Sequence, residues 1–244
     1  MVDSMGLRGV QWGNTVTDEE RKHHAAKAVE ALSDLADTLG LHPKDISLDG
    51  KLGLAIGARG KGTAMAHYEP GTQVINLTRA NGVGTFAHEW GHAFDHMLNA
   101  FESSKDGASF MSKDFMRTHE LHQPNEPGSR VWKVDESDTP SKGFEKRERP
   151  MLGIRKAFKE WGKANAPFVK RLTSVLRNEV REGLLSRQKA EYWGSTEELF
   201  ARSFEQHVQQ KLRKEGKDNT YLAGLNSHEY WPTKEESEAM APAF

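Results

Sequence analysis

The residues of this sequence that could most directly do chemistry are His88, Glu89 and His92, which form an H-E-x-x-H pentapeptide. Residues four apart lie one turn apart on the same face of a helix, so the two histidines can offer their imidazoles to one metal ion. Glu89 follows its histidine directly, so its carboxylate can act as a general base beside that metal without being a ligand. The pattern predicts a zinc site that activates water.

The flanks of the pentapeptide predict the helix that this site requires. They are apolar nearly all round, which indicates a buried helix whose histidines need partners; the apolar residues are Phe86, Ala87, Trp90, Ala93, Phe94, Met97 and Leu98. Asp95 and His96 fall on the histidine face and could orient the imidazoles from outside the metal. The alternative is a pair of core histidines with no metal.

Composition narrows the classes of protein and of metal site. The 244 residues have a net charge of −1 and contain no cysteine, which excludes disulfides and thiolate ligands and suits a catalytic zinc held by His and carboxylate. No apolar run is long enough to span a membrane, and the first residues lack the pattern of a signal peptide, so we expect a cytoplasmic protein. The near-zero charge gives no reason to expect nucleic acid as a partner.

The residues before the pentapeptide predict a helix and a small sheet. Residues 1–16 read as an irregular or short-stranded lead-in. Thr17 and Glu20 then form a capping box, and the apolar stripe that follows ends at Gly40. Residues 52–56, 64–68 and 72–77 read as strands joined by tight turns, and the strand from Val74 to Leu77 is our candidate edge for holding substrate. We therefore predict an α+β fold in which a mostly antiparallel sheet packs on the metal-binding helix.

The rest of the chain divides into a polar stretch without periodicity and a helical C-terminal part. Residues 99–149 are polar and without periodicity, which predicts a long loop or insertion within one domain of residues 1–244, with a possible role as a lid. The pattern of residues 150–244 predicts a helical C-terminal part that supplies the third ligand. From Lys142 to Lys189, fourteen Lys or Arg residues stand against five Glu, and we interpret this excess as a solvated helical surface, the alternative being a docking face for an acidic or nucleic-acid partner.

A catalytic zinc normally takes three protein ligands, so two histidines are not enough. The metzincin continuation is absent because Asp95 and Leu98 stand where its glycine and third histidine belong. The predicted helix that starts at Ser195 or Thr196 offers carboxylates beside its apolar stripe. Spacing alone leaves the third ligand open among Glu198, Glu197 and Glu205, and the first two could instead cap the helix or complement its dipole.

A resemblance to a known family bears on that choice. The sequence resembles the zincin-like metallopeptidase domains of large polyvalent proteins in phages and other mobile elements, and its active-site motifs are similar to those of the gluzincin domain of anthrax lethal factor. The matching segments are residues 9–14, 52–62, 67–71, 74–78, 88–95 and 198–205. The resemblance implies a zincin-like fold, Glu198 as the third zinc ligand and Tyr192 as a donor to the reacting oxyanion. Arg202 stands where the lethal factor motif carries an acid.

Together these observations predict a zinc metalloendopeptidase that hydrolyses a protein or peptide substrate. His88, His92 and Glu198 would hold Zn²⁺, and Glu89 would activate water, with Tyr192 as the second catalytic residue. The alternative function is a zinc-binding protein-interaction module of a mobile-element protein, with little or no catalysis.

Overall fold

The computed structural model describes residues 1–58, 66–78, 84–103, 110–113, 120–122, 130–132, 149–224 and 229–244. The chain forms two compact units, and each of them takes two separate stretches of the sequence. The first unit comprises Met1–Met97 and Phe204–Ser227, and the second comprises Leu98–Ser203 and His228–Phe244. The predicted α+β class is confirmed, whereas the expected single domain stays a prediction.

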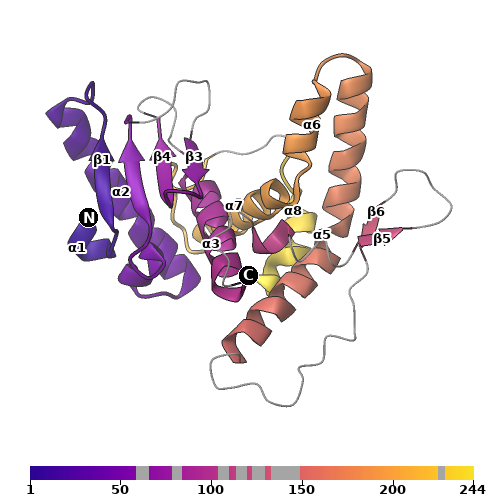
Figure 1. Ribbon diagram of the computed structural model, residues 1–244, viewed down its shortest axis with the longest axis horizontal. Coiled ribbons are helices and arrows are strands. Elements are labelled where there is room, and N and C mark those ends of the chain that lie inside the picture. Colours follow the sequence, from indigo (N-terminus) through magenta and orange to yellow (C-terminus); the bar gives the residue numbers. More distant parts are fainter. Residues whose placement is uncertain are drawn as a thin grey trace. The chain divides into compact units, whose positions relative to one another are not determined.

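The first unit contains a four-stranded sheet with helices (Figure 1). Its longest helix begins as predicted, because the Thr17 hydroxyl and the Glu20 carboxylate cap each other's backbone N–H groups, and it ends at Gly40, whose φ is 67°. The elements in chain order are α1 (Val2–Met5), β1 (Gly9–Trp12), α2 (Asp18–Leu39), η1 (Pro43–Ser47), β2 (Gly53–Ile56), β3 (Ala66–Glu69), β4 (Val74–Leu77) and α3 (Phe86–Ser103).

The sheet corrects two of our predictions. Its strand order is β1-β2-β4-β3, and two of its three pairings, β1 with β2 and β2 with β4, are parallel. The expected mostly antiparallel sheet is therefore wrong, because α2 is a crossover that returns the chain to pair β2 parallel with β1. The expected edge at β4 is also wrong, since β4 lies between β2 and β3 and all four of its residues are buried.

The core of the first unit fixes the orientation of α3. Trp90 is 2% exposed, stacks on the rings of Phe94 and Phe204, and donates a hydrogen bond from Nε1 to the carbonyl of Ile46 at 2.9 Å. A buried indole that is both stacked and hydrogen-bonded has little freedom to rotate. Because Trp90 lies about 200° around the helix from His88, this anchor leaves the histidine face directed away from it.

The second unit is mainly helical. Its elements are the antiparallel pair β5 (Glu120–His122) and β6 (Arg130–Trp132), α5 (Arg149–Arg181), α6 (Arg187–Trp193), the first part of α7 (Thr196–Lys214), α8 (Lys234–Met240) and η2 (Ala241–Ala243). The rings of Phe158, Trp161 and Phe200 form its core. The helical part expected over residues 150–244 stays a prediction, although α5, α6, α7 and α8 lie within that range. Most of the predicted insertion over 99–149 lies outside the described residues.

Arg171 ties the C-terminal segment to α5 within this unit. Its guanidinium forms an ion pair with Glu236 at 2.8 Å and donates to the carbonyls of Glu229 and Trp231, each at 2.6 Å. Planar guanidinium donors that bind several acceptors at once fix geometry as well as adding energy. Among the described residues, no helix is both long and apolar enough to cross a membrane.

Candidate metal centre

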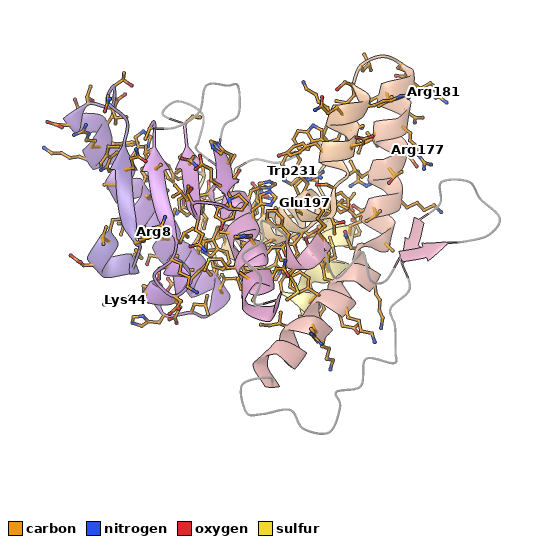
Figure 2. All side chains as sticks on the ribbon, viewed as in Figure 1. Arg8, Lys44, Arg177, Arg181, Glu197 and Trp231 are labelled. Carbon is orange, nitrogen blue, oxygen red and sulfur yellow. The ribbon has the colours of Figure 1, made fainter. Side chains whose placement is uncertain are left out.

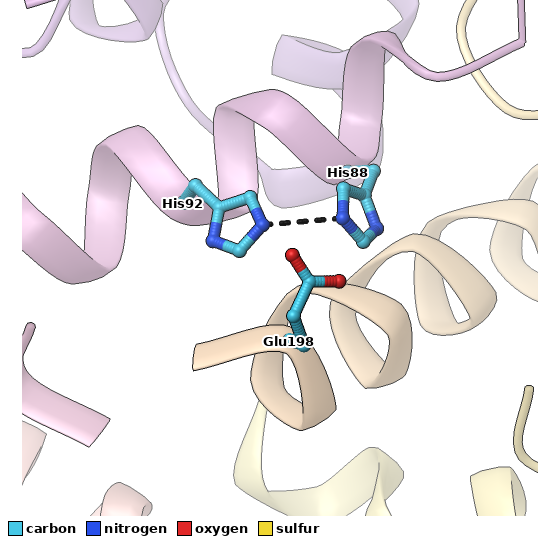
Figure 3. A group of neighbouring side chains, drawn as sticks. All are labelled: His88, His92 and Glu198. Atoms are coloured by element: carbon cyan, nitrogen blue, oxygen red, sulfur yellow. Dashed lines mark hydrogen bonds between the residues drawn. The ribbon is translucent and has the colours of Figure 1, made fainter. Parts of the chain in front are cut away.

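Helix α3 presents His88 and His92 side by side, as the four-residue spacing predicts. Their Nε2 atoms lie 3.1 Å apart, and the ring planes are inclined by 81° (Figure 3). His92 is 8% exposed, so its ring is largely withdrawn from water. Two imidazole nitrogens that point at the same small volume are the arrangement that a shared metal ion needs.

The first turn of α3 is clamped by the loop that follows α7. Gly84 accepts a hydrogen bond from the Gly224 N–H and donates to the Tyr221 carbonyl at 3.1 Å, while the Ala87 N–H donates to the Leu222 carbonyl at 2.9 Å. These bonds satisfy donors at the helix start that have no partner within the helix itself. Because His88 follows Ala87 directly, the clamp also fixes the position from which its ring projects.

Glu198 completes the predicted group. One ligand atom from each of His88, His92 and Glu198 can be chosen so that all lie within 4.8 Å of one another, and Figure 3 shows the carboxylate directed at the two imidazoles. Glu198 is 2% exposed. A carboxylate so deeply buried is costly unless a cation or donors compensate its charge.

The donor set fits zinc. Tetrahedral zinc with Zn–N bonds of 2.0–2.1 Å places two ligand nitrogens about 3.3 Å apart, close to the observed spacing of the Nε2 atoms. Two imidazoles and one carboxylate are also a donor set found in catalytic zinc sites, which keep one position open. The three side chains could therefore hold zinc after a small movement of the carboxylate.

Glu205 lies on the other side of His88. Its Oε2 atom is 3.5 Å from the Nδ1 atom of His88, and the residue is 2% exposed. Glu205 follows Glu198 by seven residues, or about two turns of α7, so both carboxylates lie on the same helical face. A carboxylate at the distal nitrogen of a metal-binding histidine fixes the tautomer and the orientation of its ring.

The sequence left the third ligand open among three glutamates, and the structure gives each a different position. Glu198 belongs to the group that could hold a metal ion, and Glu205 approaches the Nδ1 atom of His88. Glu197 forms an ion pair with Lys113, in which Oε1 and Nζ are 3.4 Å apart.

The two predicted catalytic residues differ in exposure. Glu89 lies in the first turn of α3 and is 6% exposed. Tyr192 lies in α6, is 56% exposed, and has a ring contact with Trp193. The role of Tyr192 at an oxyanion stays a prediction.

Arg202 is a residue whose role the sequence did not indicate. It is fully buried and donates hydrogen bonds to the carbonyls of Glu198 at 3.0 Å, Tyr230 at 2.6 Å and Trp193. Its guanidinium also faces the ring of Trp193 at 5.4 Å. A buried cation satisfied by carbonyls and aromatic faces joins the end of α6 to the first turn of α7, where Glu198 lies.

His96 and Asp95, expected as outer partners of the histidines, are both buried. His96 Nδ1 and the Tyr68 hydroxyl form a hydrogen bond of 2.9 Å. Burial raises the pKa of Tyr68 above its ordinary value, so the hydroxyl keeps its proton at neutral pH. The contact joins β3 to α3 beyond the turn that carries His92.

Comparison with known proteins gives one match, over the C-terminal quarter of the chain. Residues 184–244 match the model of the family described as large polyvalent protein-associated domain 1. No curated protein and no solved structure matches the chain. The match supports the part of the expected resemblance that concerns large polyvalent proteins of phages and mobile elements, and it includes Glu198 but not α3.

Proposed function

We propose that this protein is a zinc-dependent peptidase that hydrolyses peptide bonds. The observation that carries the proposal is the convergence of His88, His92 and Glu198, with Glu89 directly after the first histidine. The buried Glu205 beside His88 supports it, because a carboxylate at the other ring nitrogen is the usual partner that orients a metal-binding histidine.

In this proposal Glu89 and Tyr192 have separate roles in the reaction. When bound, zinc supplies Lewis acidity that polarises a carbonyl and makes water a stronger acid. Glu89 accepts a proton from the attacking water as the new carbon–oxygen bond forms, and it passes that proton to the nitrogen as the carbon–nitrogen bond breaks. Tyr192 is the candidate donor to the oxyanion, a contact that would require its exposed ring to turn toward substrate.

The substrate strand is assigned to β3 in place of β4. Among the described strands β3 pairs only with β4, so its outer side can accept an added peptide strand. Its Tyr68 contacts His96 of α3, which ties this edge to the helix that carries the histidines. Backbone hydrogen bonds from β3 would hold the substrate extended.

The first prediction separates metal binding from catalysis. We expect the Glu89→Gln protein to bind about one zinc per chain, as the parent does, and to lose at least about 100-fold in cleavage rate, because the amide cannot accept the proton. The measurements are elemental mass spectrometry and mass-spectrometric detection of products from a mixed peptide library. Glu182→Gln, which removes an exposed carboxylate, is the control. Unchanged cleavage by Glu89→Gln would sink the proposal.

The alternative, a zinc-binding interaction module, is favoured by the family match, whose description names an association with large polyvalent proteins. The same experiment distinguishes the two functions. A module would bind zinc through the same three residues, leave the peptide library intact, and lose stability in Glu198→Ala without any change in Glu89→Gln. Cleavage by the zinc-loaded parent would exclude it.

A further inference from the structure

Helix α5 carries a row of cations that no part of the proposed function uses. The sequence shows an excess of basic residues in this region, but only an unbroken helix puts them on one face, and α5 continues from Arg149 to Arg181 through Pro167. Seven basic residues then fall within about 100° of arc on the helical wheel. We call them the basic stripe: Arg155, Lys156, Lys159, Lys163, Lys170, Arg177 and Arg181.

The opposite face of α5 is the one that packs. Before and after Pro167 the same face carries buried apolar side chains: Phe158, Trp161, Phe168, Leu172 and Leu176. Five members of the basic stripe are exposed and the other two are half-buried. Figure 2 shows Arg177 and Arg181 projecting from α5 on the side away from α6.

The spacing along the stripe is regular. Lys156, Lys163, Lys170 and Arg177 recur every seven residues, so successive members are about 10.5 Å apart along the helix axis, and the row from Lys156 to Arg181 covers about 37 Å of that axis. Like charges three and four residues apart on a helix repel, so the basic stripe lowers the stability of α5. The acidic neighbour Glu160 pairs with Lys163 at 3.3 Å.

These features favour one class of partner. An acidic protein surface binds through apolar or aromatic anchors at the centre of its interface, and the described side chains of the stripe provide none. A nucleic acid presents closely and regularly spaced phosphates, and it is held by such a row of cations through counterion release. We propose that the basic stripe of α5 binds the phosphodiester backbone of a nucleic acid.

The expected binding is sequence-independent and salt-dependent. Each phosphate contact contributes about 0.9 to the slope of log affinity against log salt for duplex DNA. The stripe variant Lys156→Gln/Lys163→Gln/Lys170→Gln/Arg177→Gln should therefore bind at least about tenfold more weakly, with a slope smaller by about 3 to 4. Glutamine keeps the helix propensity, so the fold should be unaffected.

The experiment is a fluorescence anisotropy titration of the full chain with a labelled 30-base-pair DNA duplex, at salt concentrations from 50 to 200 mM. The control variant Lys22→Gln/Lys44→Gln/Arg213→Gln/Lys234→Gln removes three lysines and one arginine from other exposed positions, so both variants have the same net charge. Circular dichroism verifies that both are folded.

We expect the parent and the control variant to bind with similar affinity and the stripe variant to bind weakly. Absence of parent binding at 50 mM salt would overturn the proposal, as would equal losses in the two variants, which would show a dependence on net charge alone. Competition by poly-glutamate as effective as competition by unlabelled duplex would assign the stripe to an acidic protein and overturn it too. None of these outcomes depends on zinc or on peptide cleavage.

Discussion

At the scale of single residues, Glu205 is the side chain next to the candidate metal-binding group of His88, His92 and Glu198. It is buried beside the distal nitrogen of His88, where a carboxylate makes the ring a stronger ligand and holds its tautomer. We predict that Glu205→Gln weakens zinc affinity by about 10-fold to 100-fold, the range for such outer partners. The measurement is a competition titration with a chromogenic zinc chelator.

The control for this prediction is Glu215→Gln, which removes an exposed carboxylate just beyond the end of α7. It should leave the dissociation constant of zinc unchanged. If Glu205→Gln bound zinc as tightly as the parent, the contact with His88 would be a packing contact alone. Loss of zinc to the extent expected of Glu198→Ala would instead make Glu205 a direct ligand.

Among the structural elements, the start of α3 depends on a close approach of two backbones. Gly84 has a φ of +88°, and an added Cβ would lie 2.7 Å from the Cα of Gly224. We predict that Gly84→Ala lowers the free energy of unfolding by about 1–3 kcal/mol, because the strained φ and the contact both oppose a side chain. Urea unfolding followed by circular dichroism measures the loss.

Gly71→Ala is the matched control, since a Cβ there would meet nothing within 4 Å. It should change the unfolding free energy by less than about 0.5 kcal/mol. Equal stability of the Gly84→Ala protein and the parent would contradict the prediction, because it would show that the loop after α7 can shift away from Gly84 without a cost in free energy.

The elements differ in how far the sequence could predict them. Helix α2 was predictable at both ends, because a capping box and a glycine act locally. The positions of β2, β3 and β4 were also predicted, but the strand order was not, since the sequence of a short apolar strand does not indicate which strands pair with it. The sequence allowed a short strand within residues 1–16 but did not indicate its partner, so the parallel pairing of β1 with β2 across α2 was not predictable.

The candidate metal site was likewise predictable only where its residues are close in the sequence. His88 and His92 were predictable because one helix turn separates them. Glu198 and Glu205 share a face of α7, so spacing could not separate a metal-binding carboxylate from one that approaches a histidine's far side. The role of Arg202 was not predictable, because its acceptors are backbone carbonyls of Trp193 in α6 and of Tyr230 in the C-terminal segment, which no local pattern identifies.

For the molecule as a whole, buried histidines set a dependence of stability on pH. Burial, with the nearby cations Lys211 and Lys214, lowers the pKa of His207 to about 4. Burial and the neighbouring His23 also lower the pKa of His24. An unfolded histidine binds a proton near pH 6.5, so between that pH and about 4 the unfolded chain takes up protons that the folded chain refuses. Stability therefore rises with pH across this window and falls on acidification.

We predict that His207→Gln removes part of this acid sensitivity. The parent, freed of metal with a chelator, should lose unfolding free energy between pH 7 and pH 4.5, and the variant should lose on the order of 1–2 kcal/mol less, because glutamine takes up no proton on unfolding. Urea unfolding at both pH values gives the two differences. His42→Gln, which replaces an exposed histidine, should keep the slope of the parent. A parental slope in His207→Gln would mean that the acid sensitivity arises from His24 and the carboxylates, because those groups are common to both proteins.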